Sequence, residues 1–187
     1  MFRRFLGPVQ PAAAPASSNA AASAAGETAT VRRIVARLDA MPPEQARLIA
    51  SAAYTLARAA NADLEISDDE TAAIEQELQA HDGLDEATAV LVTEMAKLQA
   101  RTMGETEDYV VTREFKALAS EAQRLDVLRA CFAIGAANGT ISAEETAVVN
   151  QIARELDITD ATLNAIRAEY HEQLSAVQRI RRVTNGG

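Results

Sequence analysis

Two short polar segments of the chain carry oxygen-bearing side chains at spacings that suit either helix capping or cation binding. Loop 1, at residues 61–71, reads NADLEISDDET, and loop 2, at residues 136–146, reads AANGTISAEET. An offset of 75 residues aligns Ile66 with Ile141, so a helix–loop–helix unit occurs twice along the chain. Because there are only two copies, we predict a globular domain of two related halves and not an open solenoid.

Each loop leads into the pattern of a capping box. Ser67 precedes Glu70 by three residues, and Ser142 precedes Glu145 by the same spacing. In such a box the serine oxygen accepts from a backbone N–H of the new helix, and the acid accepts from the backbone N–H of the serine. Ser120 starts a third box with no acidic loop before it, so capping explains these residues without any ligand.

The polar residues before each serine are not needed for capping and are candidate ligands of a hard cation. Asp63, Glu65 and Asn138 are oxygen donors of the kind that Ca²⁺ and Mg²⁺ bind. An EF-hand is excluded, because a twelve-residue loop starting at Asp63 would place Ile74 where that motif has its bidentate glutamate. Pseudo-two-fold packing could bring the loops together, with the candidate metal ligands Asp63, Glu65, Glu70, Asn138 and Glu145.

Helices must position these loops, because the apolar spacing beyond the N-terminal tail is helical and nowhere alternates as in a strand. The spacing predicts about seven to eight helices, the first across 31–41 and the last across 163–177. Each helix has one apolar face, and such faces must be buried against one another. We predict an all-α bundle over residues 30–183, with a flexible Ala/Pro/Ser-rich tail at 1–29 and a disordered end at 184–187.

The composition limits the classes of partner and the compartment. A net charge of -9 should repel nucleic acid and anionic lipid surfaces, so neither is an expected partner. No run of about 18 apolar residues is present in the sequence, which argues against a transmembrane segment. The single Cys131 fits a reducing compartment, and its place on an apolar stripe predicts a small core residue and not a nucleophile. We predict a cytoplasmic protein.

Both ends of the chain carry basic segments. The N-terminal MFRRFL is followed by Gly7 and Pro8, which interrupt any signal-peptide core, so we expect a retained, frayed terminus, with docking into a groove as the alternative. The C-terminal QRIRRVTNGG places three arginines at a helix end, where they complement the helix dipole. The alternative is contact with an acidic partner or with the acidic loops of a second copy, and the oligomeric state stays open.

The repeated unit of a small apolar run, a turn, Ile-Ser, two variable residues and Glu is similar to the tellurite resistance TerB family. The resemblance covers roughly residues 43–170 and is strongest in CFAIGAANGTISAEETAVVNQIARELDIT. It implies a compact all-α fold of two related halves and a place among stress-response proteins. It also implies a metal site at the acidic loops, for which the matching residues are Asp63 with Glu70 and Asn138 with Glu145.

The chain departs from the family pattern in both loops. Leu64 stands where the family has glycine, and a left-handed turn costs a non-glycine residue about 1–2 kcal/mol, so we expect loop 1 to turn differently. Asn138 stands where the family has aspartate, which removes one carboxylate from loop 2. We therefore favour capped turns over a metal site.

No catalytic motif accompanies the loops. The sequence lacks paired Glu-x-x-His motifs, a Gly-x-x-x-x-Gly-Lys phosphate loop and a Gly-x-Ser-x-Gly elbow. We predict a non-catalytic protein without a resident cofactor, acting as a TerB-like adaptor in a tellurite or envelope stress response. Its expected partners are proteins, membrane-associated stress-response proteins among them. The alternative is a regulatory protein that binds a divalent cation through the two acidic loops.

Overall fold

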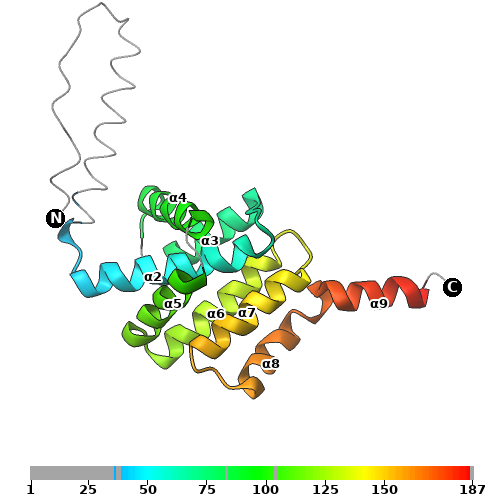
Figure 1. Cartoon of the computed structure of the whole chain (residues 1–187). Coiled ribbons are helices and arrows are strands. Elements are labelled where there is room, and N and C mark those ends of the chain that lie inside the picture. Colours follow the sequence, from blue (N-terminus) through cyan, green and yellow to red (C-terminus); the bar gives the residue numbers. More distant parts are fainter. Residues whose placement is uncertain (1–35, 37–38, 83, 103–104, 186–187) are drawn as a thin grey trace, which may run out of the picture. The chain divides into compact units, whose positions relative to one another are not determined.

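A computed structural model describes residues 36, 39–82, 84–102 and 105–185 of the chain (Figure 1). The tail predicted at 1–29, with its MFRRFL segment, and most of the helix predicted across 31–41 lie outside the described residues. From Ala40 onward the chain forms one compact unit.

The predicted all-α class is confirmed. The described part of the chain contains eight α-helices and two short 3₁₀ turns, η1 and η2, and no β-strand. In chain order the elements are α2 (Pro43–Ala60), η1 (Asn61–Asp63), α3 (Asp68–Asp82), α4 (Glu86–Thr102), α5 (Glu105–Leu118), α6 (Glu121–Gly135), α7 (Ala143–Glu155), α8 (Asp160–Glu169), η2 (His171–Gln173) and α9 (Ser175–Asn185). No helix among these described residues is both long enough and apolar enough to cross a membrane.

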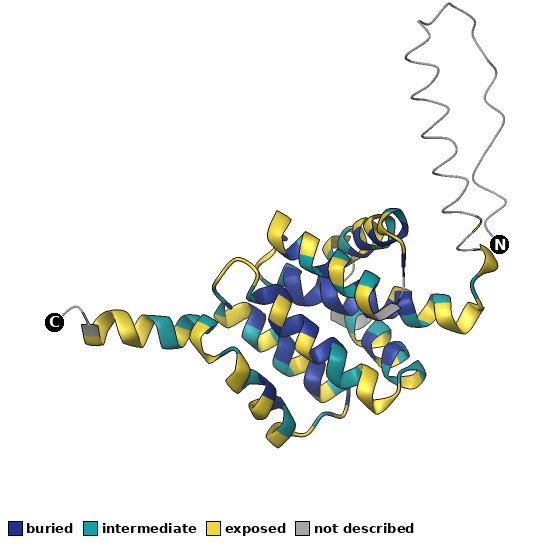
Figure 2. Ribbon diagram, turned by 180° about the vertical axis from the view of Figure 1, so that it is seen from behind, coloured by how far each residue is buried: buried dark blue, intermediate teal, exposed yellow. Residues whose placement is uncertain are grey.

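Helix α2 is the centre of the bundle and contacts α3, α4, α5, α6 and α7. Every residue from 51 to 60 is buried, and half of these ten are alanines. Alanine favours the helix and its small side chain lets neighbouring helices approach closely on all sides. Figure 2 shows the buried residues gathered in the middle of the bundle and the exposed residues on its outward faces.

A buried polar cluster ties α2 to α5 and α7. Arg58 of α2, only 7% exposed, donates from Nη1 to Glu155 Oε2 at 2.7 Å and to Thr112 Oγ1 at 2.9 Å. Its Nε also lies 3.5 Å from Asp108 Oδ2. A buried guanidinium without such partners would be strongly destabilising, so this cluster holds the three helices in one arrangement.

The helix predicted across 163–177 is wrong, because the structure divides it into α8 and α9. Helix α8 ends at Glu169, and Leu174 adopts an extended conformation that pairs with Ile141 of loop 2. The Ile141 N–H donates to Gln173 O at 2.8 Å, and the Ser175 N–H donates to Ile141 O at 2.9 Å. These tertiary hydrogen bonds replace the local bonds that a continuous helix would make. Helix α9 then continues to Asn185, two residues beyond the boundary predicted at 183.

Candidate functional site

Loop 1 and loop 2 make the same left-handed turn. Leu64 has φ 71° and ψ 8°, and Gly139 has φ 90°. The expectation that loop 1 turns differently is therefore wrong, because a leucine adopts the conformation that suits glycine. The cost is about 1–2 kcal/mol, and the Leu64 side chain is 81% exposed, so burial within the chain does not offset it.

The polar residue before each turn has the same role in both loops. Asp63 Oδ1 accepts from the Glu65 N–H at 3.1 Å, and Asn138 Oδ1 accepts from the Thr140 N–H at 3.0 Å. Aspartate and asparagine both supply the acceptor oxygen that such a turn needs. The exchange of aspartate for asparagine between the loops therefore keeps the turn and changes only the charge.

The capping boxes predicted after each loop are confirmed. Glu70 Oε2 accepts from the Ser67 N–H at 2.8 Å, and Ser67 Oγ accepts from the Glu70 N–H at 3.2 Å. Glu145 Oε2 accepts from the Ser142 N–H at 2.6 Å, and Ser142 Oγ accepts from the Glu145 N–H at 3.0 Å. The third box, which starts at Ser120, is also present.

The two capping glutamates also contact each other, which the sequence did not predict. Glu70 of α3 and Glu145 of α7 are each 3% exposed, and their carboxyl groups lie close enough to interact electrostatically. Burial raises the pKa of Glu145 to about 7; its hydrogen bonds with Ser142 oppose this rise, and the negative charge of Glu70 adds to it. Because its pKa is raised, Glu145 keeps its proton to a higher pH than a solvent-exposed glutamate does.

Gly135 at the end of α6 makes room for this carboxyl pair. A Cβ atom at this position would lie 3.1 Å from Glu145 Oε1, closer than nearly all real contacts of this kind. Gly135 aligns with the buried Ala60 at the repeat offset, so each half has a small residue at this place. A small residue at the same position of both repeats is the sequence signal that could have indicated a buried group next to the loops.

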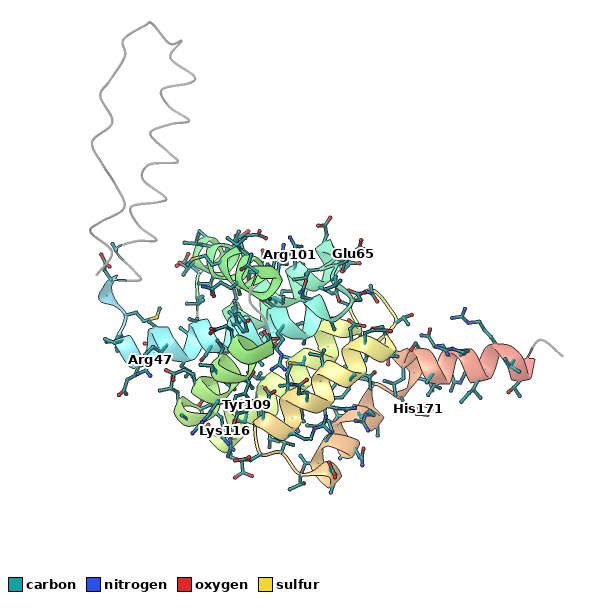
Figure 3. All side chains as sticks on the ribbon, in the orientation of Figure 1. Arg47, Glu65, Arg101, Tyr109, Lys116 and His171 are labelled. Carbon is teal, nitrogen blue, oxygen red and sulfur yellow. The ribbon has the colours of Figure 1, made fainter. Side chains whose placement is uncertain are left out.

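An open cavity of about 320 Å³ lies beside loop 1, and Asn138 of loop 2 and Arg101 of α4 complete its lining. The cavity contains four of the five predicted ligands, while Glu145 lies against Glu70. It is lined by Asp63, Leu64, Glu65, Ile66, Ser67, Glu70, Arg101 and Asn138. Figure 3 shows Arg101 of α4 and Glu65 of loop 1 at the same edge of the molecule. Arg101 is a positively charged residue among these acids, and it was not identified from the sequence.

Four of the five predicted metal ligands each use a side-chain oxygen in a turn or a cap. Asp63 and Asn138 accept from loop N–H groups, while Glu70 and Glu145 accept from the capping serines. Within the described residues, no three His, Cys, Asp or Glu side chains converge as a group that could hold a metal ion. This arrangement fits a pair of capped turns better than a preformed coordination sphere.

The remaining candidates for chemistry are Cys131 and the two histidines. Cys131 is 1% exposed, which confirms its prediction as a core residue, and burial raises the pKa of its thiol to about 12. His171 lies on the surface in η2, and the side chain of His81 lies outside the described residues. The buried thiol is therefore poorly suited to act as a nucleophile.

Residues 48–168 match the family model described as Tellurite resistance protein TerB. The chain belongs to the TerB family. The TerB match begins in α2 and ends in α8, so it includes both loops, the carboxyl pair and Gly135, but not α9. No curated protein and no solved structure matches the chain. The resemblance that the sequence suggested is thus confirmed at the level of the family.

Proposed function

We propose that this TerB-family chain is a non-catalytic interaction module that serves as an adaptor in a tellurite or envelope stress response. Its binding surface is the loop face, which we define as the exposed residues Asp63, Leu64, Glu65, Asp68, Asp69, Asn138 and Glu144. The observation that carries the proposal is one cavity lined by residues of two loops that share a left-handed turn and a capping box.

The loop face combines a firm frame with an exposed apolar centre. Two capping boxes and the Glu70–Glu145 contact hold the backbone beneath it. Leu64 projects from this frame among the carboxylates of Asp63 and Glu65. A large apolar side chain surrounded by polar groups is typical of the residues that dominate binding energy in protein interfaces. Backbone strain, as at Leu64, also gathers at functional sites.

The chemistry of the loops favours binding over turnover. Burial raises the pKa of Glu145, but this carboxyl group lies beneath the loops and is hydrogen-bonded to Ser142. A general acid or base must reach a reacting atom within hydrogen-bond distance. Turnover of a phosphate ester or an oxyanion that Glu70→Gln abolishes would contradict a non-catalytic role.

Site-specific photo-crosslinking in cells of the source organism tests the loop face as a protein-binding surface. A photoreactive amino acid at Leu64 should form adducts with partner proteins. The matched control is the same amino acid at Val110 of α5, which is also exposed, at 53%. Adducts that form equally at both positions, or at neither, would contradict the proposal.

Divalent-cation binding by the same loops is a separate hypothesis, which a cation titration tests. Amide NMR spectra of the full chain would be recorded with Ca²⁺, Mg²⁺, Mn²⁺ and Zn²⁺ in turn. Saturable changes confined to 61–71 and 136–146, and absent from the Glu70→Gln/Glu145→Gln double variant, would establish a metal-responsive protein. Unchanged spectra below millimolar cation would rule this role out.

A further inference from the structure

Helix α9 turns its polar side toward its own domain. Gln178 Nε2 donates to Gly139 O at 3.0 Å and to Glu172 O at 3.2 Å, and Gln178 Oε1 lies 3.1 Å from Thr140 Oγ1. Arg181 forms a bidentate ion pair with Glu172. These contacts determine which side of the helix faces the bundle.

The apolar side of α9 lies away from these contacts, with Val177 partly buried and residues 179–184 exposed. Val177, Ile180 and Val183 are spaced by three residues and share one arc of the helix. Ile180 is 66% exposed and Val183 is 77% exposed, and Figure 2 colours most of α9 as exposed. Helix α9 extends away from the bundle (Figure 1), and an exposed apolar arc flanked by charged side chains is typical of an interaction site.

Charge narrows the choice of partner. Arg179 and Arg181 lie on either side of the apolar arc, and Arg182 lies opposite it. Pairing α9 with α9 of another copy would bring six arginines together. An anionic membrane would meet a chain of net charge -9 and an apolar arc of only three aliphatic residues, which is too little for stable anchoring. The best complement is an acidic surface with an apolar centre.

The loop face of this same chain is such a surface. Leu64 is 81% exposed, with the carboxylates of Asp63, Glu65, Asp68 and Asp69 around it in sequence. Arg101, which lines the adjoining cavity, is the opposing charge on this side. The acids outnumber it, so opposite charges would meet around an apolar contact between Leu64 and the arc of α9.

We propose that α9 of one copy docks on the loop face of a second copy, and that the contact is reciprocal in a two-fold dimer. The start of α9 is bound to loop 2 through Ile141, and loop 2 shares its cavity with loop 1. The start of α9 and the loop face therefore lie at the same end of the folded domain. A single two-fold axis can then form both α9–loop contacts of the dimer. The inference rests on the proposed function, because it uses the loop face as a protein-binding surface and names the occupant.

Sedimentation velocity of the full chain over a concentration series, at low and high salt, tests this dimer. The wild-type protein should dimerise, and high salt should weaken the dimer. Ile180→Glu/Val183→Glu and, separately, Leu64→Lys should each weaken self-association about tenfold or more. Val110→Glu, an exposed apolar residue on α5, is the matched control and should leave it unchanged. Circular dichroism of each variant checks that the substitution at an exposed position has not unfolded the chain.

A charge exchange makes the test specific for these two surfaces. Arg179→Glu, which changes an arginine beside the apolar arc, and Asp68→Lys/Asp69→Lys should each dimerise poorly alone, and mixing the two should restore a heterodimer. Overturning outcomes are a wild-type chain that is monomeric at every concentration, α9 variants that dimerise like wild type, or binding of a monomeric chain to anionic vesicles through α9. A monomeric chain that still crosslinks to other proteins from position 64 would overturn the dimer and leave the proposed function standing.

Discussion

The two loops share one backbone geometry but differ in what surrounds them. Loop 2 is joined to the C-terminal part of the domain, because Ile141 is 1% exposed and pairs with Leu174. In loop 1 the equivalent Ile66 is only partly buried and the strained Leu64 is almost fully exposed. The comparison teaches that duplicated sequence reproduces the turn, while packing buries the isoleucine of one copy and leaves the turn of the other exposed.

The largest expected difference concerns the two isoleucines that align in the repeat. Ile141→Ala should lower the free energy of unfolding by about 3 kcal/mol, because truncating a buried isoleucine removes transfer energy and leaves a cavity. Ile66→Ala should cost about half as much, since Ile66 is only partly buried. Urea unfolding with unchanged m-values would measure both costs. Equal costs would contradict the conclusion that Ile141 of loop 2 belongs to the core to a greater extent than Ile66 of loop 1.

The contact between Glu70 and Glu145 joins the two loops and predicts that the free energy of unfolding depends on pH. Burial raises the pKa of Glu145 from the usual 4.5 to about 7, so between these values the folded state holds a proton that the unfolded state has lost. The contribution of this proton to the free energy of unfolding should therefore be complete below about pH 4.5 and should be lost as the pH rises toward 7. A fall of about 1–2 kcal/mol allows for partial solvent screening.

Glu145→Gln should flatten this profile, because the amide keeps the capping oxygen and does not titrate, while Glu70→Gln should only reduce the slope, because burial is the larger cause of the raised pKa. Thermal unfolding from pH 4 to pH 8 measures the slope in each variant. Glu144→Gln, which changes an exposed neighbour, is the control and should retain it. If the stability of Glu145→Gln changed with pH as steeply as that of the wild type, the Glu145 proton would not be the cause of the pH dependence.

Exchanging the turn residues should shift stability in opposite directions. Leu64→Gly should stabilise by up to about 1 kcal/mol, since relief of the left-handed strain exceeds the added freedom of the unfolded chain. Gly139→Leu should destabilise by about 1–2 kcal/mol through φ 90° alone, because a Cβ at this position meets nothing within 4 Å. Chemical unfolding of both variants measures these changes in the free energy of unfolding. A destabilised Leu64→Gly would mean that the leucine contributes packing within the chain.

The smallest expected effects come from exchanging the polar residues of the turns. Asp63→Asn and Asn138→Asp each keep the oxygen that accepts from the N–H two residues ahead. We expect changes within about 0.5 kcal/mol in the free energy of unfolding. Asp63→Ala and Asn138→Ala, which remove the acceptor, should cost more in the same assay. If Asp63→Asn cost as much as Asp63→Ala, charge and not turn geometry would explain the aspartate.

The sequence by itself determined the helical class, the repeat, the capping boxes and the core position of Cys131. Each follows from interactions over short separations: apolar spacing selects a helical face, and Ser67 reaches Glu70 within one turn. Only the tertiary structure decided the Glu70–Glu145 contact, the left-handed Leu64 and the break after Glu169. These depend on packing between segments far apart in the chain, where a hydrogen bond to Ile141 or a buried partner outweighs local preference.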